Sequence, residues 1–270
     1  IDLIKKGIQE IKMGKLKKVV LSRKLYVECD KSPWELFQEL LGRYPSAFCY
    51  LWYHPKVGMW LGASPELLLS AGNNHLNTSS LAGTQVYNGL EKPVWGEKEL
   101  QEQAMVTQYI MAALEDKVTD LSVSKTQSVR AGNLWHLGTG ISGRIKDMAL
   151  SPIIKALHPT PAVCGLPKGE SQKFILENEN YDREFYTGFL GELNMKEQVE
   201  RNRNSKNQEN TAYTLVRNTT QLFVNLRCMK LDGKIASLYV GGGITKESDP
   251  EKEYQETVEK SKTLLKVIYA

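Results

Sequence analysis

Apolar residues recur at intervals of three and four in several segments, which predicts helices near both ends of the chain and between them. Residues 2–14 show this spacing before Gly14, and residues 32–46 begin with Ser-Pro, a pair that favours a helix start. Residues 97–117 and 248–268 carry the same pattern, and Ser248 or Asp249 with Pro250 suits an N-cap. Residues 151–169 predict a short helix followed by a loop rich in proline and glycine.

Strands are expected where apolar runs are bounded by turn residues, at 18–28, 48–54, 58–72, 119–130 and 133–146. Residues 220–244 predict a hairpin that turns at Asp232-Gly233, with the triplet Gly241, Gly242 and Gly243 as a turn after its second strand. The polar residues 195–210 indicate a mobile surface excursion. The interpretation is one mixed α+β domain, residues 1–270, without internal repeats.

Composition excludes several classes of protein. Of 270 residues 41% are hydrophobic and 24% charged, which is ordinary for a globular domain and argues against general disorder. A net charge of +4, spread along the chain, is too small for a dedicated nucleic-acid binder. No apolar run approaches the ~18 residues that span a bilayer, so we expect a cytoplasmic protein, and a monomer because no exposed apolar stripe stands out. The four scattered cysteines are expected to be buried free thiols.

Acidic residues on two predicted helices are candidates for a metal site. Glu253, Glu256 and Lys260 share one face of the closing helix. Spacing alone is more typical of a solvated, ion-paired face, but the glycine triplet ahead would let backbone N–H groups approach an anion. Glu102, from the helix at 97–117, would add a carboxylate facing Glu256, and such a set with water suits Mg²⁺. Surface acids favoured by the helix dipole are the alternative.

Three charged residues lie within apolar runs. Lys18 precedes Val-Val-Leu, and Glu66 lies within GASPELLL. Burial there would favour a neutral amine and a neutral carboxyl, which suit a base and an acid near neutral pH, although strand ends also place charges in water. Arg227 interrupts the apolar FVNLRCM, and a buried guanidinium requires a carboxylate, either structural or from a ligand.

These segments, in this order, resemble the chorismate-utilising enzymes, which include isochorismate synthase, salicylate synthase and the large subunits of anthranilate and aminodeoxychorismate synthase. The matching stretches are KKVVLSR (17–23), GASPELLL (62–69), LAGT (81–84), KELQEQ (98–103), LWHLGTGISG (134–143), LHPTPAVCGLP (157–167), YDREFYTGFLG (181–191), VNLRC (224–228) and YVGGGITKESDPEKEYQETVEK (239–260). They span nearly the whole chain. The resemblance implies a single α+β domain of large, mostly antiparallel sheets sandwiched with helices, which binds chorismate with Mg²⁺.

The resemblance also implies roles for individual residues. Glu102 and Glu256 match metal-coordinating glutamates, with Glu253 close to the metal. Lys18 and Glu66 match the general base and general acid of isochorismate-forming members. The substrate-binding positions are expected to be Arg227, Tyr239 and Lys260 for the carboxylates, the backbone of Gly241, Gly242 and Gly243, and Thr84 and His136 in the pocket wall.

Two positions favour the isochorismate synthase branch, in which water adds at ring carbon 2 and the carbon-4 hydroxyl leaves. Lys18 stands where ammonia-using members resemble one another in carrying a non-basic residue, and Ala82 stands where aminodeoxychorismate synthases place a lysine. Salicylate synthase, which then eliminates pyruvate, stays open as the alternative, followed by an amination enzyme and a catalytically silent chorismate-binding module. The sequence departs from the family at Gln103, where many members have histidine, and at residues 85–89, where the usual Pro-Arg-Gly is replaced.

Overall fold

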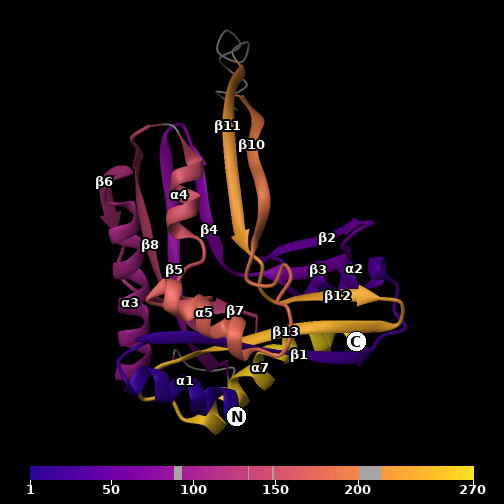
Figure 1. Ribbon diagram of the computed structural model, residues 1–270. Helices are drawn as coiled ribbons and strands as arrows, with labels where there is room; N and C mark the ends of the chain where they lie inside the picture. Colours follow the sequence, from indigo (N-terminus) through magenta and orange to yellow (C-terminus); the bar gives the residue numbers. More distant parts are fainter. Residues whose placement is uncertain (88–92, 133, 148, 201–213) are drawn as a thin grey trace.

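Two antiparallel sheets and the helices that cover them form the described part of the chain (Figure 1). The computed structural model describes residues 1–87, 93–132, 134–147, 149–200 and 214–270. Sheet A has the strand order β2 (Phe48–His54), β3 (Gly58–Ser64), β12 (Cys228–Asp232), β13 (Ile235–Ile244), β1 (Lys18–Glu28) and β9 (Gly165–Leu166). Sheet B has the order β10 (Phe189–Glu200), β11 (Thr214–Val224), β4 (Leu67–Gly72), β5 (His75–Val86), β8 (Leu134–Ile145) and β6 (Val118–Val123), with β7 (Gln127–Ala131) also paired to β8. The helices are α1 (Asp2–Lys12), α2 (Pro33–Arg43), α3 (Glu97–Leu114), α4 (Leu150–Leu157), α5 (Lys168–Asn178) and α7 (Pro250–Ile268). The predicted α+β class is confirmed.

Local sequence signals account for most helix ends. The Ser32 hydroxyl accepts from the Glu35 N–H, while the Glu35 carboxylate accepts from the Ser32 N–H, so α2 begins with a capping box. The Asp249 carboxylate accepts from the N–H groups of Glu251 and Lys252 at the start of α7. Helix α1 ends just before Gly14, whose φ of +77° favours glycine. These boundaries agree with the predictions from sequence.

Each sheet buries its own apolar face. On sheet A, α2 and α7 pack through buried residues such as Leu36, Leu40 and Leu264 against Leu61 and Leu238. Sheet B is covered by α3 and α4, and its core includes Leu68, Leu69, Leu76, Val106, Ile110, Leu114, Ile141, Ile153 and Leu157. Helix α3 thereby reaches the space between the sheets from one side, and α7 lies along β13 on the other.

Two of the places where the chain crosses between the sheets are adjacent. One is Pro65-Glu66, between β3 of sheet A and β4 of sheet B, and the other is residues 225–227, between β11 of sheet B and β12 of sheet A. The crossings are bonded to each other, because the Val224 N–H donates to the Glu66 carbonyl at 2.9 Å and the Ala63 N–H donates to the Arg227 carbonyl at 3.0 Å. Glu66 and Arg227 therefore lie where the two sheets meet.

These crossings correct two predictions. The apolar run 58–72 was expected to be one strand, but it forms β3 and β4 in different sheets. The first strand of the expected 220–244 hairpin is likewise divided into β11 and β12. The hairpin itself is confirmed for β12 and β13, with Gly233 at φ +56°. Each apolar run continues through its crossing because the strands before and after the crossing are both buried. Hydrophobicity alone therefore does not show where one strand ends and the next begins.

Other departures concern polar or short segments. The expected strand 119–130 is divided into β6 and β7, both paired with β8. The excursion expected at 195–210 begins as part of β10, paired with β11 in a ribbon that extends away from the body (Figure 1). Residues 201–210 of that prediction lie outside the described residues. Helix α5 follows the predicted proline- and glycine-rich loop, although its sequence has no continuous apolar stripe.

The cysteines follow the expectation of free thiols. The four cysteines are free thiols, and Cys29, Cys164 and Cys228 are buried while Cys49 is partly buried. No helix in the described ranges is both long and apolar enough to cross a membrane.

Candidate active site

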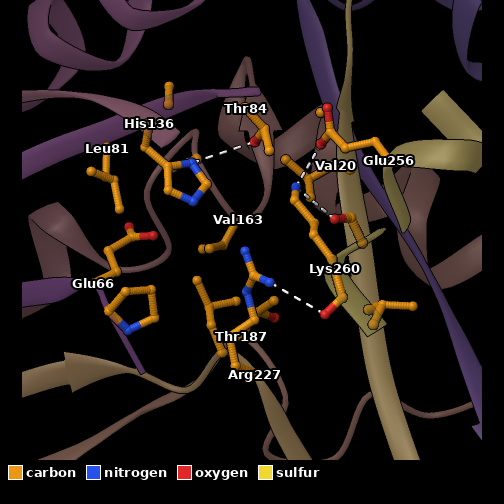
Figure 2. A pocket seen from close by; sticks show the side chains of 18 of the residues that line it. Val20, Glu66, Leu81, Thr84, His136, Val163, Thr187, Arg227, Glu256 and Lys260 are labelled. Atoms are coloured by element: carbon orange, nitrogen blue, oxygen red, sulfur yellow. Dashed lines mark hydrogen bonds and ion pairs between the residues drawn. The ribbon is translucent and has the colours of Figure 1, made fainter. Parts of the chain in front are cut away.

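A pocket opens between the two sheets, α3 and α7 (Figure 2). Its lining brings together residues from distant parts of the chain, namely Lys18, Val20, Pro65, Glu66, Leu81, Ala82, Gly83, Thr84, Glu102, His136, Ala162, Val163, Tyr186, Thr187, Leu226, Arg227, Tyr239, Val240, Gly241, Gly242, Gly243, Glu256 and Lys260. Every site residue expected from sequence lines the pocket except Glu253, which lies behind it on α7.

The pocket contains an amine and a carboxyl group, both almost fully buried. Lys18, at the start of β1, is 1% exposed, and its Nζ lies 2.7 Å from Glu102 Oε1. Glu66, at the first sheet crossing, is 5% exposed. Burial raises the pKa of Glu66 to about 7, although Lys18 and Lys260 oppose this shift. Glu66 therefore exchanges a proton near neutral pH, as a general acid must.

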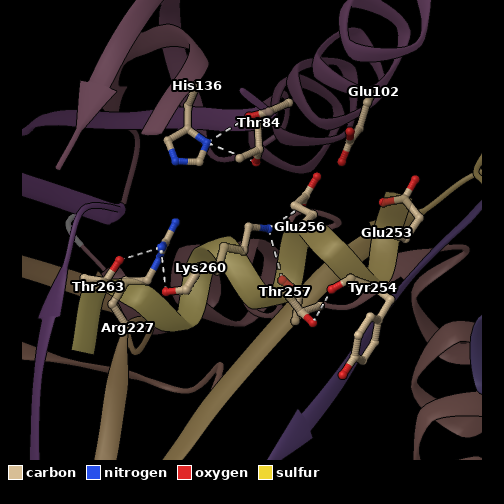
Figure 3. A network of polar contacts seen from close by, with 12 residues as sticks. Thr84, Glu102, His136, Arg227, Glu253, Tyr254, Glu256, Thr257, Lys260 and Thr263 are labelled. Atoms are coloured by element: carbon tan, nitrogen blue, oxygen red, sulfur yellow. Dashed lines mark hydrogen bonds and ion pairs between the residues drawn. The ribbon is translucent and has the colours of Figure 1, made fainter. Parts of the chain in front are cut away.

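Two cations provide an anion site in the same pocket. Arg227 Nη1 donates to the Thr263 hydroxyl at 2.9 Å and to the Lys260 carbonyl at 3.2 Å (Figure 3). Within the described residues no Asp or Glu forms an ion pair with this buried guanidinium. Lys260 donates to the Gly241 carbonyl at 3.0 Å and to Glu256 at 2.6 Å. A buried guanidinium that lacks a protein carboxylate is suited to a carboxylate on a ligand.

His136 presents a neutral ring to the same space. Its Nδ1 lies 2.8 Å from the Gly83 carbonyl, which can only accept, so Nδ1 carries the proton. Thr84 Oγ1 lies 3.4 Å from the same nitrogen. Burial lowers the pKa of His136 to about 3, with Arg227 and Lys260 adding to the shift. Nothing in the described part of the chain bonds to the buried Nε2, which is left as an acceptor for a hydroxyl group on a ligand.

One expectation about the pocket wall needs correction. Gly241, Gly242 and Gly243 are part of β13, paired with β1, and do not form a turn. A Cβ atom at Gly243 would lie 2.6 Å from Glu102 Oε1, and one at Gly241 would lie 2.8 Å from the Tyr186 hydroxyl, so this strand needs glycine for space. The Tyr239 hydroxyl donates to Glu184 at 2.9 Å. Tyr186, which sequence reasoning did not single out, also lines the pocket, and its hydroxyl lies beside Gly241.

Three carboxylates from two helices turn toward one another at the edge of the pocket, Glu102 from α3 and Glu253 and Glu256 from α7 (Figure 3). Repulsion from Glu256 adds to burial in raising the pKa of Glu253, so the two acids lie close together. Among the described residues, no three acidic, histidine or cysteine side chains are already gathered closely enough to hold an ion. Mg²⁺ commonly takes one or two carboxylates and several waters. Glu102 and Glu256, beside strand glycines that leave room for such an ion, fit that requirement.

Two further residues at the site were not predicted. Thr187 lines the pocket with a φ of +63°, within the motif YDREFYTGFLG, and its position depends on a bond from its N–H to the Asn225 carbonyl. Lys98 bonds to Glu253. Its spacing of four residues from Glu102 places the two side chains on one face of α3, and this spacing was the sequence signal that could have pointed to Lys98 as a site residue.

Gln103 is 2% exposed and donates to Ser80 and Thr139. It therefore anchors α3 to sheet B behind the pocket.

Family models and individual proteins match this chain over almost its full length. A model described as chorismate binding enzyme matches residues 1–201, and another with the same description matches residues 212–266. Isochorismate synthase DhbC of Bacillus subtilis is 29% identical, and the alignment covers 98% of this chain and 66% of that protein. The chain therefore spans slightly less than two thirds of this longer relative.

Solved structures agree with these matches. The DhbC structure from Bacillus anthracis superposes with a TM-score of 0.82 at 30% identity, covering 98% of this chain and 70% of that chain. MenF, the menaquinone-specific isochorismate synthase from Escherichia coli, superposes with a TM-score of 0.80 at 26% identity, covering 99% and 60%. The motifs, the pocket and these matches agree, and the chain belongs to the family of chorismate-binding enzymes.

Proposed function

We propose that this chain is an isochorismate synthase, which converts chorismate to isochorismate. One observation carries the proposal: Lys18 and Glu66, a buried amine and a buried carboxyl, line the same pocket. Adding water to a ring carbon while a hydroxyl leaves requires a base and an acid at one substrate. The relatives named as isochorismate synthases support the same reaction.

The pocket is suited to chorismate because that substrate carries two carboxylates on a small ring. Arg227 and Lys260 supply positive charge, and Tyr186 supplies a hydroxyl beside Gly241. The neutral Nε2 of His136 accepts from a ring hydroxyl. Together these groups bind and orient the ring before any bond changes, which is a large part of the rate enhancement in such reactions.

In the proposed reaction, the Lys18 amine takes a proton from water as the water oxygen bonds to ring carbon 2. The ring double bond shifts, the bond from carbon 4 to its hydroxyl breaks, and Glu66 gives its proton to the departing oxygen, which leaves as water. Lys18 ends protonated and Glu66 ionised, so a proton returned from Lys18 to Glu66 through solvent restores both groups. Atoms and charge balance without any oxidant or reductant.

Mg²⁺ is the metal we propose for this site, with Glu102 and Glu256 as its protein ligands and Glu253 beside them. When bound, it supplies positive charge that offsets a substrate carboxylate. The protein side chains perform the proton transfers.

Incubation of the purified protein with chorismate and Mg²⁺ is expected to yield isochorismate, and addition of a chelator is expected to stop product formation. The decisive measurement uses water labelled with a heavy oxygen isotope, followed by chromatography and mass spectrometry. Because water attacks carbon 2, isochorismate should carry the label. Salicylate as the final product would indicate the salicylate synthase branch, and a product that requires ammonia would indicate amination. An unaltered substrate under all conditions would contradict enzymatic activity.

His136→Phe is expected to raise the KM for chorismate by about tenfold, because one hydrogen bond to the substrate is lost. Steady-state kinetics across pH 6–8 provide the measurement. Since the pKa of His136 lies near 3, the ring is neutral throughout and the wild-type profile should show no histidine ionisation. His136→Gln, whose side-chain oxygen still accepts, should recover part of the affinity. An unchanged KM for His136→Phe would contradict this role.

A further inference from the structure

Each of the three site carboxylates is paired with a lysine. Glu102 Oε1 lies 2.7 Å from Lys18 Nζ, and Glu256 Oε1 lies 2.6 Å from Lys260 Nζ. Glu253, only 2% exposed, bonds to Lys98. The two proposed metal ligands and the acid beside them therefore each have a lysine of this chain as a partner in the metal-free protein.

Lys98 differs from the other two lysines. Lys18 and Lys260 line the substrate pocket, and Lys260 also donates to the Gly241 carbonyl. Lys98 does not line the pocket, and its side chain is 29% exposed, so it has a path to solvent. Its release would leave the substrate-binding groups in place.

The position of Lys98 is otherwise unfavourable. It is the second residue of α3, where the helix dipole disfavours a cation. Burial alone would lower the pKa of Lys98, but attraction to Glu253, and then to Glu102 and Glu256, raises it. The ammonium group thus lies in the combined field of the three acids, between α3 and α7.

On the basis of the proposed metal-dependent function, we infer that Lys98 is the counter-ion of the metal-free enzyme and that a divalent ion displaces it. Two cations cannot share these carboxylates without strong repulsion. In the metal-free protein Lys98 joins α3 to α7 through Glu253, and on metal binding it moves toward solvent. Lys98 therefore lowers metal affinity while stabilising the metal-free fold.

The test measures Mg²⁺ binding by titration calorimetry, without substrate. Lys98→Met is expected to bind Mg²⁺ about tenfold more tightly than the wild type, since no charge-assisted hydrogen bond has to be broken first. Lys98→Arg keeps the positive charge and should bind as weakly as the wild type. Lys262→Met is the matched control, because Lys262 forms a 2.7 Å pair with Glu259 on α7. It removes the same net charge away from the pocket and should leave Mg²⁺ affinity unchanged.

Melting temperatures provide a second readout. With chelator, Lys98→Met should melt below the wild type, and Mg²⁺ should raise its melting temperature by more than it raises that of the wild type. Circular dichroism establishes folding, and Lys98→Gln replaces Lys98→Met if the latter does not fold. If folded Lys98→Met binds Mg²⁺ no more tightly than the wild type, the inference is overturned. It is also overturned if Lys262→Met gains as much Mg²⁺ affinity as Lys98→Met does. Tighter binding in a protein that forms no isochorismate would leave the inference standing and overturn only the proposed reaction.

Discussion

Lys18→Ala is expected to lower turnover of chorismate by about 10²–10⁴-fold, the usual contribution of a general base. Without the amine, no side chain at this position takes the proton from the attacking water. The measurement is the initial rate of isochorismate formation with saturating Mg²⁺. Substrate affinity should change much less than the rate, because Arg227 and Lys260 remain in place.

Lys17→Ala is the matched control for this variant. Lys17 adjoins Lys18 in sequence and carries the same charge, but its side chain is exposed. Its replacement removes the same net charge from the protein and should leave the rate unchanged. Because Lys18 is also paired with Glu102, Mg²⁺ affinity is measured for both variants. Near-full activity of Lys18→Ala at saturating Mg²⁺ would contradict the role of base.

Glu66→Gln is expected to lower turnover by about 10²–10⁴-fold as well, since the leaving hydroxyl would no longer receive a proton. With burial raising the pKa of Glu66 to about 7, the carboxyl is protonated below that pH and ionised above it. In the wild type, kcat/KM should therefore fall as pH rises through about 7. The residual kcat/KM of Glu66→Gln should not show this decrease at alkaline pH.

Stability distinguishes a catalytic defect from a folding defect in this variant. The pKa of Glu66 is raised from 4.5 in a solvated chain to about 7 in the folded protein. Its contribution to stability is therefore present at low pH and is lost as pH rises through about 7. Glutamine stays neutral, so Glu66→Gln should be at least as stable as the wild type in denaturant titrations at alkaline pH. Glu66→Asp should retain some activity, whereas full activity of Glu66→Gln would contradict the role of acid.

Prediction from sequence was most accurate where a signal is local. The Ser32 cap, the Asp249 cap and the turn at Gly233 each depend on neighbours within three residues, and the structure has all three. Helices α1 and α7 bury the apolar faces that their spacing predicts. The resemblance placed Lys18 and Glu66 at functional positions, and the structure places both in one pocket.

Prediction failed where conformation depends on a distant partner. Strand β10 is rich in polar residues, and its pairing with β11 gives it a strand conformation that the sequence does not indicate. The Gly241–Gly243 triplet resembles a turn in sequence, but β1 pairs with it as a strand, and Glu102 and Tyr186 occupy the space beside it. Lys98 bonds to Glu253, 155 residues away, and no local pattern shows that pairing.

Apart from α5, the sequence by itself determined the helices, the positions of the apolar strand runs and the residue types needed for acid–base and anion chemistry, because caps, turns and periodicity act over a few residues. Only the tertiary structure decided that the apolar runs break at Glu66 and Arg227, and that these residues meet Lys18 and Glu102 in one pocket. The physical reason is that the two sheets bury separate cores and the chain has to cross between them. Those crossings bring together charges that are far apart in the sequence.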